Sequence, residues 1–159
     1  MPNRANALTA AAGEHYVAYR LSRMEYLVGL TRSGSPSVDL MVCHPEKGTQ
    51  VSIQVKTSKF AHRYERRKKI EYWAWRVGKQ VASLPGDSIV YAFVSLEGDK
   101  GDPICRTFIV PSKEVAARVE TDGPNAYWFI TDGFAIDDKN EKKWLEDWRL
   151  ITDTLTGDK

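Results

Sequence analysis

The sequence predicts an α/β fold in which helices flank a mixed β-sheet. The elements expected along the chain are a helix, three strands, a basic insert, two strands and two helices, an order that builds such a sheet. Residues 88–96 form a continuous apolar run, as expected of a central strand that is buried on both faces. The chain has 159 residues, of which 42% are hydrophobic, and it has no repeat or linker, so residues 1–159 are expected to form a single domain.

The first helix is predicted over residues 5–24, where apolar residues recur at helical spacing. Glu14 is unusual because it lies in line with Val17 and Leu21 on the apolar stripe of this helix. A carboxylate in that position is costly unless it is paired, protonated or bound to a cation. The alternative is that Glu14 lies at the edge of the stripe and reaches solvent.

Two alternating stretches on either side of a turn at residues 44–49, which contains Pro and Gly, predict a β-hairpin. Gln54 and Lys56 lie on the same side of the second strand, and Asp39 lies on the polar side of the first. Two registers are open. With the turn centred on residues 46–47, Asp39 faces Gln54, and with the turn centred one residue later it faces Lys56. Either register gathers an acid, an amide and an ammonium group.

The remaining segments are predicted to be strands and helices separated by polar loops. Residues 59–69 are either a loop or a short helix, and the polar tail from Thr152 onward is expected to fray. Trp73 and Trp75 are expected to pack in the core rather than stack on bases, and the tryptophans of the last helix are expected in the core as well. The other predicted elements are a first strand at 26–30, strands at 70–77 and 106–110, a loop at 98–103, a helix capped by Ser112, an edge strand at 125–131, and a helix over 137–151 that carries Trp144, Leu145 and Trp148.

The polar residues of the hairpin and the first helix suggest a metal site. Glu14, Asp39 and Gln54 offer two carboxylates and an amide oxygen, which are hard ligands suited to Mg²⁺ or Mn²⁺. Such a metal lowers the pKa of a bound water and shields the charge of a phosphate. Lys56 on the same face can orient the attacking hydroxide or stabilise a pentacovalent phosphate. These roles indicate metal-assisted hydrolysis of a phosphodiester. The alternative is a solvated polar face on a half-exposed sheet.

The charge distribution indicates where a polyanion would bind. Residues 1–55 carry a net charge of +1, residues 56–79 carry +7, and residues 80–159 carry −6. The positive charge therefore follows the polar cluster directly and favours nucleic acid there, although a solvated basic face is the simpler alternative. The candidate phosphate contacts are Lys59, His62, Arg63, Arg66, Arg67, Lys68 and Lys69.

The arrangement of these residues resembles the PD-(D/E)XK nuclease superfamily, whose members have the restriction-endonuclease-like fold with an αβββαβ-type core. The resemblance rests on Glu14 in a helix, Asp39 in the next hairpin strand, and Gln54-Val55-Lys56 near the end of the strand that follows. Most members have Glu or Asp where this chain has Gln54, and a neutral amide binds metal more weakly. The Gln-x-Lys form is similar to a branch that includes a group I intron homing endonuclease and small bacterial proteins.

The resemblance implies a Mg²⁺-dependent DNA endonuclease, with Mn²⁺ as a possible substitute. Asp39 would be the central metal ligand, Glu14 the helix acid, and the Val55 carbonyl a backbone ligand. Gln54 would complete the site and Lys56 would be the catalytic lysine. The rival interpretations are a non-catalytic nucleic-acid-binding module of the same fold and a protein-interaction module.

Partners and location are expected to follow from this function. DNA is the expected partner, although RNA is not excluded, and a homodimer is expected because one site cuts one strand. Cys43 and Cys105 are neither a disulfide framework nor a zinc site, so a reducing cytoplasm is expected. No apolar run approaches the roughly 20 residues of a membrane helix, so no membrane span is expected.

Overall fold

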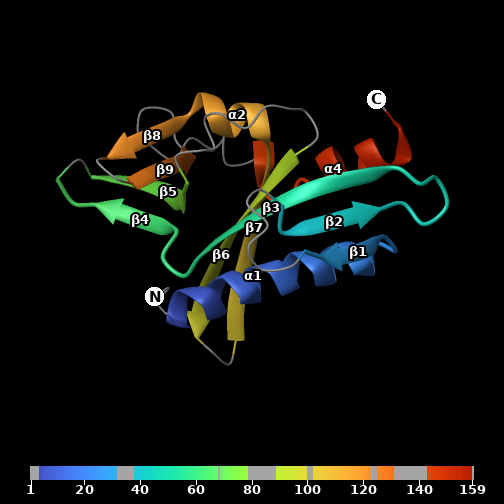
Figure 1. Ribbon diagram of the computed structural model, residues 1–159. Coiled ribbons are helices and arrows are strands. Elements are labelled where there is room, and N and C mark those ends of the chain that lie inside the picture. The colour runs from blue at the N-terminus through green and yellow to red at the C-terminus, as the bar shows by residue number, and fades with distance from the viewer. Residues whose placement is uncertain are drawn as a thin grey trace.

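The structure is a computed structural model that describes residues 4–31, 38–67, 69–78, 89–99, 102–122, 125–130 and 143–158. In these ranges the strands form two sheets, one five-stranded and mixed, the other four-stranded and antiparallel (Figure 1). The predicted fold class, a mixed sheet with flanking helices, is confirmed. The helices are α1 (Arg4–Arg23), α2 (Ser112–Ala117) and α4 (Arg149–Thr156). The strands are β1 (Leu27–Leu30), β2 (Leu40–Cys43), β3 (Gln50–Ser58), β4 (His62–Glu65), β5 (Ile70–Val77), β6 (Ile89–Asp99), β7 (Asp102–Pro111), β8 (Val119–Asp122) and β9 (Asn125–Ile130).

The five-stranded sheet has the order β1-β2-β3-β6-β7. β2 pairs antiparallel with both β1 and β3. β3 pairs with β6 in parallel, and β6 pairs antiparallel with β7. A parallel pair needs a crossover connection. In the described part of the β3–β6 connection this crossover contains β4 and β5, and residues 79–88 lie outside the description. Figure 1 shows α1 running alongside the sheet, with β1, β2 and α4 toward one end and β4, β5, β8 and β9 toward the other.

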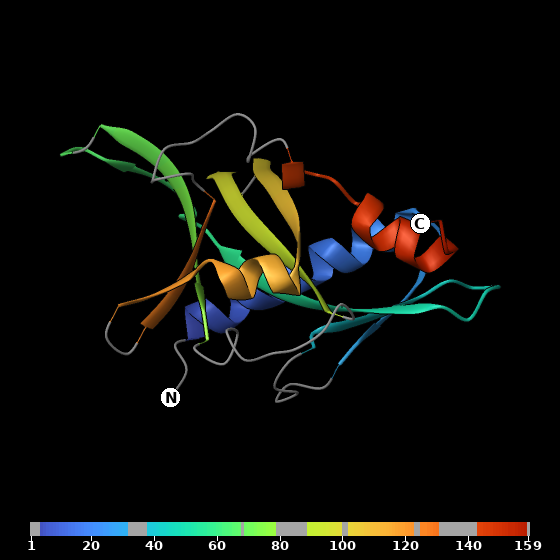
Figure 2. The same ribbon diagram turned by 90° about the horizontal axis from the view of Figure 1, so that it is seen from above.

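The two sides of β6 belong to two different cores. On one side Val90, Ala92 and Val94 pack in a cluster with side chains of α1, β2, β3 and α4. On the other side Tyr91 and Phe93 pack with aromatic residues of β5 and β7. The strand is therefore buried on both faces, as its continuous apolar run predicts. Figure 2, viewed from above, shows the strands of the second sheet on one side of the molecule and α4 on the other.

Aromatic rings dominate the second core. Trp73 and Trp75 are both about 1% exposed, and their rings lie 6.0 Å apart. The Trp75 ring also packs 5.3 Å from Phe93 and 5.5 Å from Phe108. These tryptophans are core residues, as predicted, and are not available for stacking on bases.

Two predictions about local structure in the second sheet are wrong. The basic segment contains the strand β4, which pairs with β5, rather than a loop or a short helix. Its side chains at 62–64 are exposed, so it lacks the hydrophobic alternation that identifies a strand in sequence. β9 is not an edge strand, because it pairs with β5 on one side and β8 on the other. A third prediction, in the five-stranded sheet, is also wrong: β6 and β7 extend through most of the loop predicted at 98–103.

The C-terminal segment also differs from the prediction. Residues 137–142 of the expected helix lie outside the described residues, and Leu145 forms an isolated β-bridge with Phe108. The helix α4 begins only at Arg149 and includes most of the tail that was expected to fray. Ile151 and Leu155 are fully buried, and this packing holds the last helix in place. Trp144 and Trp148 are buried, as predicted, at 3% and 6% exposure.

The start of α2 corrects a smaller prediction. Pro111 occupies the N-cap position, where its extended backbone makes no side-chain cap hydrogen bond. Ser112 is the first helical residue and is buried at 3% exposure, so it is not the cap. Among the described helices, none is long and apolar enough to cross a membrane.

Candidate functional site

The hairpin register places Asp39 opposite Gln54. Leu40 pairs with Ile53, so of the two registers open from the sequence the structure adopts the one with the earlier turn. The turn is held by His44, whose Nδ1 accepts the backbone N–H groups of Glu46 and Lys47, each at 3.2 Å. This side-chain contact stabilises a turn of fixed length, and the turn length sets the register.

Asp39 lies directly before the first residue of β2, opposite a part of β3 that continues beyond the pairing. Its backbone N–H donates to the Ile53 carbonyl at 2.9 Å, and its own carbonyl accepts the Thr31 N–H at 2.9 Å. Its Oδ2 accepts the Val55 N–H at 2.7 Å. Among the described residues no hydrogen bond to its other carboxylate oxygen is found. The Asp39 side chain thus takes the place of a strand partner for Val55 and leaves one oxygen for another ligand.

A row of side chains crosses three neighbouring strands at this point. Gln54 on β3 lies beside Asp39 on one side and pairs in register with Tyr91 of β6 on the other. Lys56 pairs in register with Phe93. Gln54 is only 7% exposed and Tyr91 is fully buried. The row is therefore not the solvated face of a half-exposed sheet, because the second core covers much of it.

The helix α1 brings Glu14 to the same place. Gly13 is buried against Thr57 of β3, and a Cβ atom at position 13 would lie 2.8 Å from Thr57 Cγ2 and 2.9 Å from Thr57 Cβ. Real Cβ atoms do not approach other atoms so closely, so glycine is what permits this contact between helix and strand. Glu14 follows directly, and it is half-buried rather than fully solvated.

The three charged groups influence one another. Burial raises the pKa of Glu14, and the nearby Asp39 carboxylate raises it further, while His15 and Lys56 act in the opposite direction. Burial lowers the pKa of Lys56, an effect that Asp39 and Glu14 oppose. Two carboxylates and one ammonium group therefore lie within electrostatic reach of one another, and burial disfavours the charge on both Glu14 and Lys56.

The donor set at this point fits a hard divalent cation. In the described residues no group of three or more His, Cys, Asp and Glu side chains has the geometry of a metal centre. The Glu14 and Asp39 carboxylates lie within electrostatic reach of each other, and Gln54, opposite Asp39 on β3, offers an amide oxygen. The Val55 carbonyl is a further candidate ligand. The N–H and C=O groups of a strand residue point toward the same neighbouring strand, and the Val55 N–H donates to Asp39, so the carbonyl points to that side as well. Hard oxygen ligands suit Mg²⁺ or Mn²⁺, and a cation would relieve the repulsion between Glu14 and Asp39.

The predicted basic segment lies immediately beyond Lys56. Most of its side chains are exposed; Lys68 lies outside the described residues. His62 packs on the Trp73 ring at 4.8 Å, and its Nε2 lies 3.7 Å from Glu71, so it has partners within the protein. A polar groove of about 560 Å³ runs along the end of β3, and its lining residues are Ala5, Asn6, Thr9, Thr57, Ser58, Lys59, Phe60, Arg63 and Arg76.

Three residues of this region were not found from the sequence. Gly13 looked like a weak point of the helix, although it makes the contact that positions Glu14. Arg76 had a signal, because it lies within the basic stretch, but it belongs to the same strand as Trp73 and Trp75, where the tryptophans dominate. Tyr91 gave no local signal in its apolar run. Burial, and to a lesser degree Asp39, raises its pKa to about 12, and no described group hydrogen-bonds its hydroxyl.

Comparison with known proteins yields a match at the level of structure. No family model matches the sequence, and no curated protein matches it. The solved structure of a bacterial homing endonuclease, I-Ssp6803I, superposes with a TM-score of 0.60 at 14% sequence identity. The superposition covers 99% of this chain and 96% of that chain, so the two share a fold over nearly their whole length.

Proposed function

We propose that the chain is a metal-dependent endonuclease of the PD-(D/E)XK type, in its Gln-x-Lys form, that hydrolyses phosphodiester bonds of DNA. One observation carries the proposal: two mutually repelling carboxylates, Glu14 and Asp39, lie beside Lys56 in a half-buried cluster at the open end of the hairpin. The fold shared with a homing endonuclease supports a nuclease in general.

The roles follow from the donors. Glu14, Asp39, Gln54 and the Val55 carbonyl would hold Mg²⁺, with Mn²⁺ as a substitute. When bound, the ion supplies a water of lowered pKa and shields phosphate charge. Lys56 is a cation that interacts electrostatically with both carboxylates. Its role is to orient the attacking water or to stabilise the negative charge that grows on the phosphate.

DNA is the proposed substrate, and a homodimer the proposed assembly. The exposed cations that follow Lys56 provide contacts for the phosphates on either side of the scissile bond. One such site cuts one strand, so cleavage of both strands requires two copies. The proposed phosphate contacts are Lys59, Arg63, Arg66, Arg67, Lys68 and Lys69, with His62 as a weaker candidate because of its contacts with Trp73 and Glu71.

The test is cleavage by the purified protein with Mg²⁺ or Mn²⁺, on linear, branched and single-stranded DNA at several salt concentrations. The variant Lys56→Ala should lose activity by about 10²–10³-fold, as expected when one electrostatic stabiliser is removed. Lys47→Ala is the matched control, since Lys47 lies in the distant turn and its ammonium group, within the described residues, donates to the Thr156 carbonyl alone. Thermal melts establish that both variants are folded. Cleavage by Lys56→Ala at the parent rate, or no cleavage by the parent, contradicts the proposal.

A second function, a nucleic-acid-binding module without catalysis, is favoured by one residue. Gln54 provides a neutral amide where a carboxylate would bind a metal more strongly. Calorimetric titration with Mn²⁺ separates the two functions. The enzyme should bind Mn²⁺ and lose this binding in Asp39→Asn, whereas the non-catalytic module should bind DNA and show no Mn²⁺ binding that depends on Asp39.

A further inference from the structure

Two grooves meet on the surface directly after β3. The first is the polar groove beside Lys59, Arg63 and Arg76. The second, of about 860 Å³, lies between α1 and the β6–β7 hairpin. Lys59 and Phe60 line both grooves, so these two residues form the boundary between them.

The polar groove has the character of a site for a nucleic-acid backbone. Its three cations, Lys59, Arg63 and Arg76, come from the β3–β4 connection and two neighbouring strands, and none of its described lining residues is acidic. Thr57 and Ser58 line it as well and follow Lys56 directly along the chain. A phosphate chain lying in this groove therefore leads to the proposed cleavage site.

The second groove has a different character. Its walls carry Tyr16, Tyr19, Leu96 and the ring of Phe60, which are mostly apolar or aromatic surfaces. Phe60 is 79% exposed and Tyr19 is 60% exposed. Large exposed aromatic side chains around a hollow are typical of a binding surface, and aromatic rings are what unpaired bases stack on.

The second groove differs from the polar groove in having a carboxylate among its lining residues, beside His15 and the shared Lys59. Glu97 lines this groove, and its Oε1 accepts the hydroxyl of Ser95 at 2.8 Å. A carboxylate repels phosphate but accepts hydrogen bonds from the amino groups of bases. The two grooves therefore differ in the way that the backbone and the bases of one strand differ.

We propose that the protein binds DNA that contains an unpaired base, with the backbone in the polar groove and the base stacked on Phe60 in the second groove. This inference rests on the proposed function for the identity of the polyanion and names its substrate class. An unpaired base costs little to move out of the helix, whereas a paired base must first be unstacked. Phe60 is four residues from Lys56, so the unpaired base lies near the strand that is cut.

The test compares two labelled duplexes of the same sequence, one fully paired and one with a single extra adenine. Affinity is measured by fluorescence anisotropy in EDTA, so that binding is separate from cutting. The parent protein should prefer the duplex with the unpaired base by roughly tenfold. Phe60→Ala should remove most of this preference. Tyr64→Ala is the matched control, because Tyr64 is an exposed aromatic residue on β4 that lines neither groove, and its preference should equal that of the parent.

The polar groove is tested with the same duplexes. Arg63→Ala should weaken binding to both equally and reduce the slope of log affinity against log salt by about 0.9, as expected for one lost phosphate contact. Equal affinity of the parent protein for the two duplexes overturns the inference, and so does an undiminished preference in Phe60→Ala. Cleavage without this preference would leave the nuclease proposal standing, and preference without cleavage would leave only this inference.

Discussion

Two charged clusters share the helix α1 and differ in how their charges are satisfied. The first cluster is centred on Arg20, whose Nη1 donates to the Tyr16 hydroxyl at 2.9 Å and to Glu146 Oε2 at 2.8 Å. Glu146 also accepts the Thr107 backbone N–H at 2.7 Å and the Trp148 indole N–H at 3.0 Å. The guanidinium lies 4.9 Å from the centre of the Trp148 ring. This cluster ties the helix, the sheet and the C-terminal segment together.

The cluster at Glu14 is built in the opposite way. Its two carboxylates repel each other, and burial acts against the charged forms of both Glu14 and Lys56. An arrangement of this kind does not stabilise the fold but is ready for a cation or a phosphate. The charges of Arg20 and Glu146 therefore serve the structure, whereas Glu14 and Asp39 disfavour each other's charge, as the proposed metal site requires. Substitutions in the two clusters should therefore have effects of opposite sign on stability.

The largest expected effect is the loss of Glu146. Glu146→Ala leaves the Thr107 N–H and the Trp148 indole N–H without an acceptor, and it leaves Arg20 with only the Tyr16 hydroxyl of its two acceptors. Partial exposure to water moderates the cost to about 3 kcal/mol. The midpoint of thermal unfolding should fall by about 6–12 °C. Circular dichroism melts provide the measurement.

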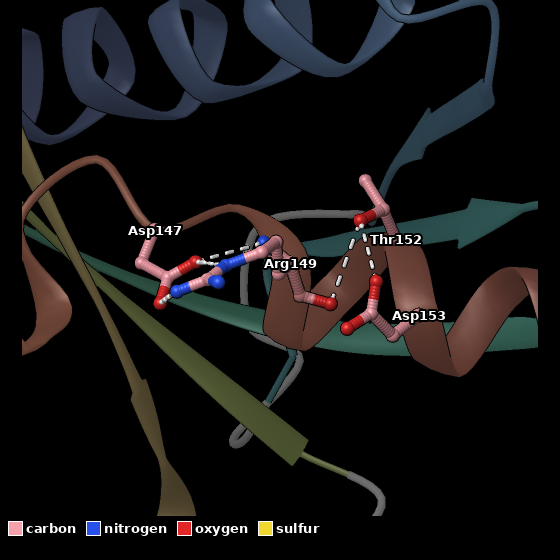
Figure 3. A network of polar contacts seen from close by, with 4 residues as sticks. All are labelled: Asp147, Arg149, Thr152 and Asp153. Atoms are coloured by element: carbon pink, nitrogen blue, oxygen red, sulfur yellow. Dashed lines mark hydrogen bonds and ion pairs between the residues drawn. The ribbon is translucent and has the colours of Figure 1, made fainter. Parts of the chain in front are cut away.

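The control is an acid next in sequence with a different environment. Asp147 pairs with Arg149 through contacts of 2.7 Å at the exposed start of α4, where Thr152 and Asp153 also contact each other (Figure 3). Because this pair is local and exposed, Asp147→Ala should change the melting temperature little. If the two variants melt alike, the Glu146 cluster does not have the structural role assigned to it.

The next largest effect is expected at Gly13. In Gly13→Ala the new methyl group collides with Thr57, which costs about 1–3 kcal/mol, partly offset by about 1 kcal/mol from the better helix propensity of alanine. Chemical unfolding provides the measurement. Thr57→Ala removes the colliding Oγ1 and Cγ2 atoms but keeps Cβ, so the double variant should recover part of the loss. Additive losses in the double variant would show that the helix does not approach β3 at this point.

Substitution of Glu14 should raise the stability of the fold rather than lower it, by an amount that depends on pH. Since its folded pKa is raised above the ordinary value of 4.5, the folded state is most favoured below that value and loses stability as pH rises through the raised pKa. Glu14→Gln should therefore be more stable than the parent at about pH 8, with the difference shrinking toward pH 4.5. Melts across this range test the prediction, and a difference that does not change with pH would refute the raised pKa.

The smallest effect is expected at Tyr91. Its hydroxyl is buried and has no hydrogen-bond partner among the described residues, so Tyr91→Phe should stabilise the protein by about 1 kcal/mol. Tyr19→Phe is the matched control, because Tyr19 is 60% exposed and its hydroxyl can bond to water. Lower stability in Tyr91→Phe would show that the hydroxyl has a partner in the folded protein.

The sequence by itself determined the hairpin, the alternation that buries Ile53 and Val55, and the place of Glu14 in line with Val17 and Leu21 on α1, because each depends on residues close together in the chain. It also anticipated the buried tryptophans and the double-sided burial of β6. The prediction for β4 was wrong because an exposed strand has no hydrophobic period, and the last helix begins later than predicted, at Arg149.

Tertiary structure alone decided how these pieces meet. The register of Asp39 with Gln54 is fixed by the pairing of β2 with β3, and the place of Tyr91 beside Gln54 depends on the parallel pairing of β3 with β6. The two grooves exist only because α1, the β3–β4 connection and the β6–β7 hairpin come together in space. Contacts between residues far apart in the chain depend on packing, which has no local period, and so local sequence patterns do not reveal them.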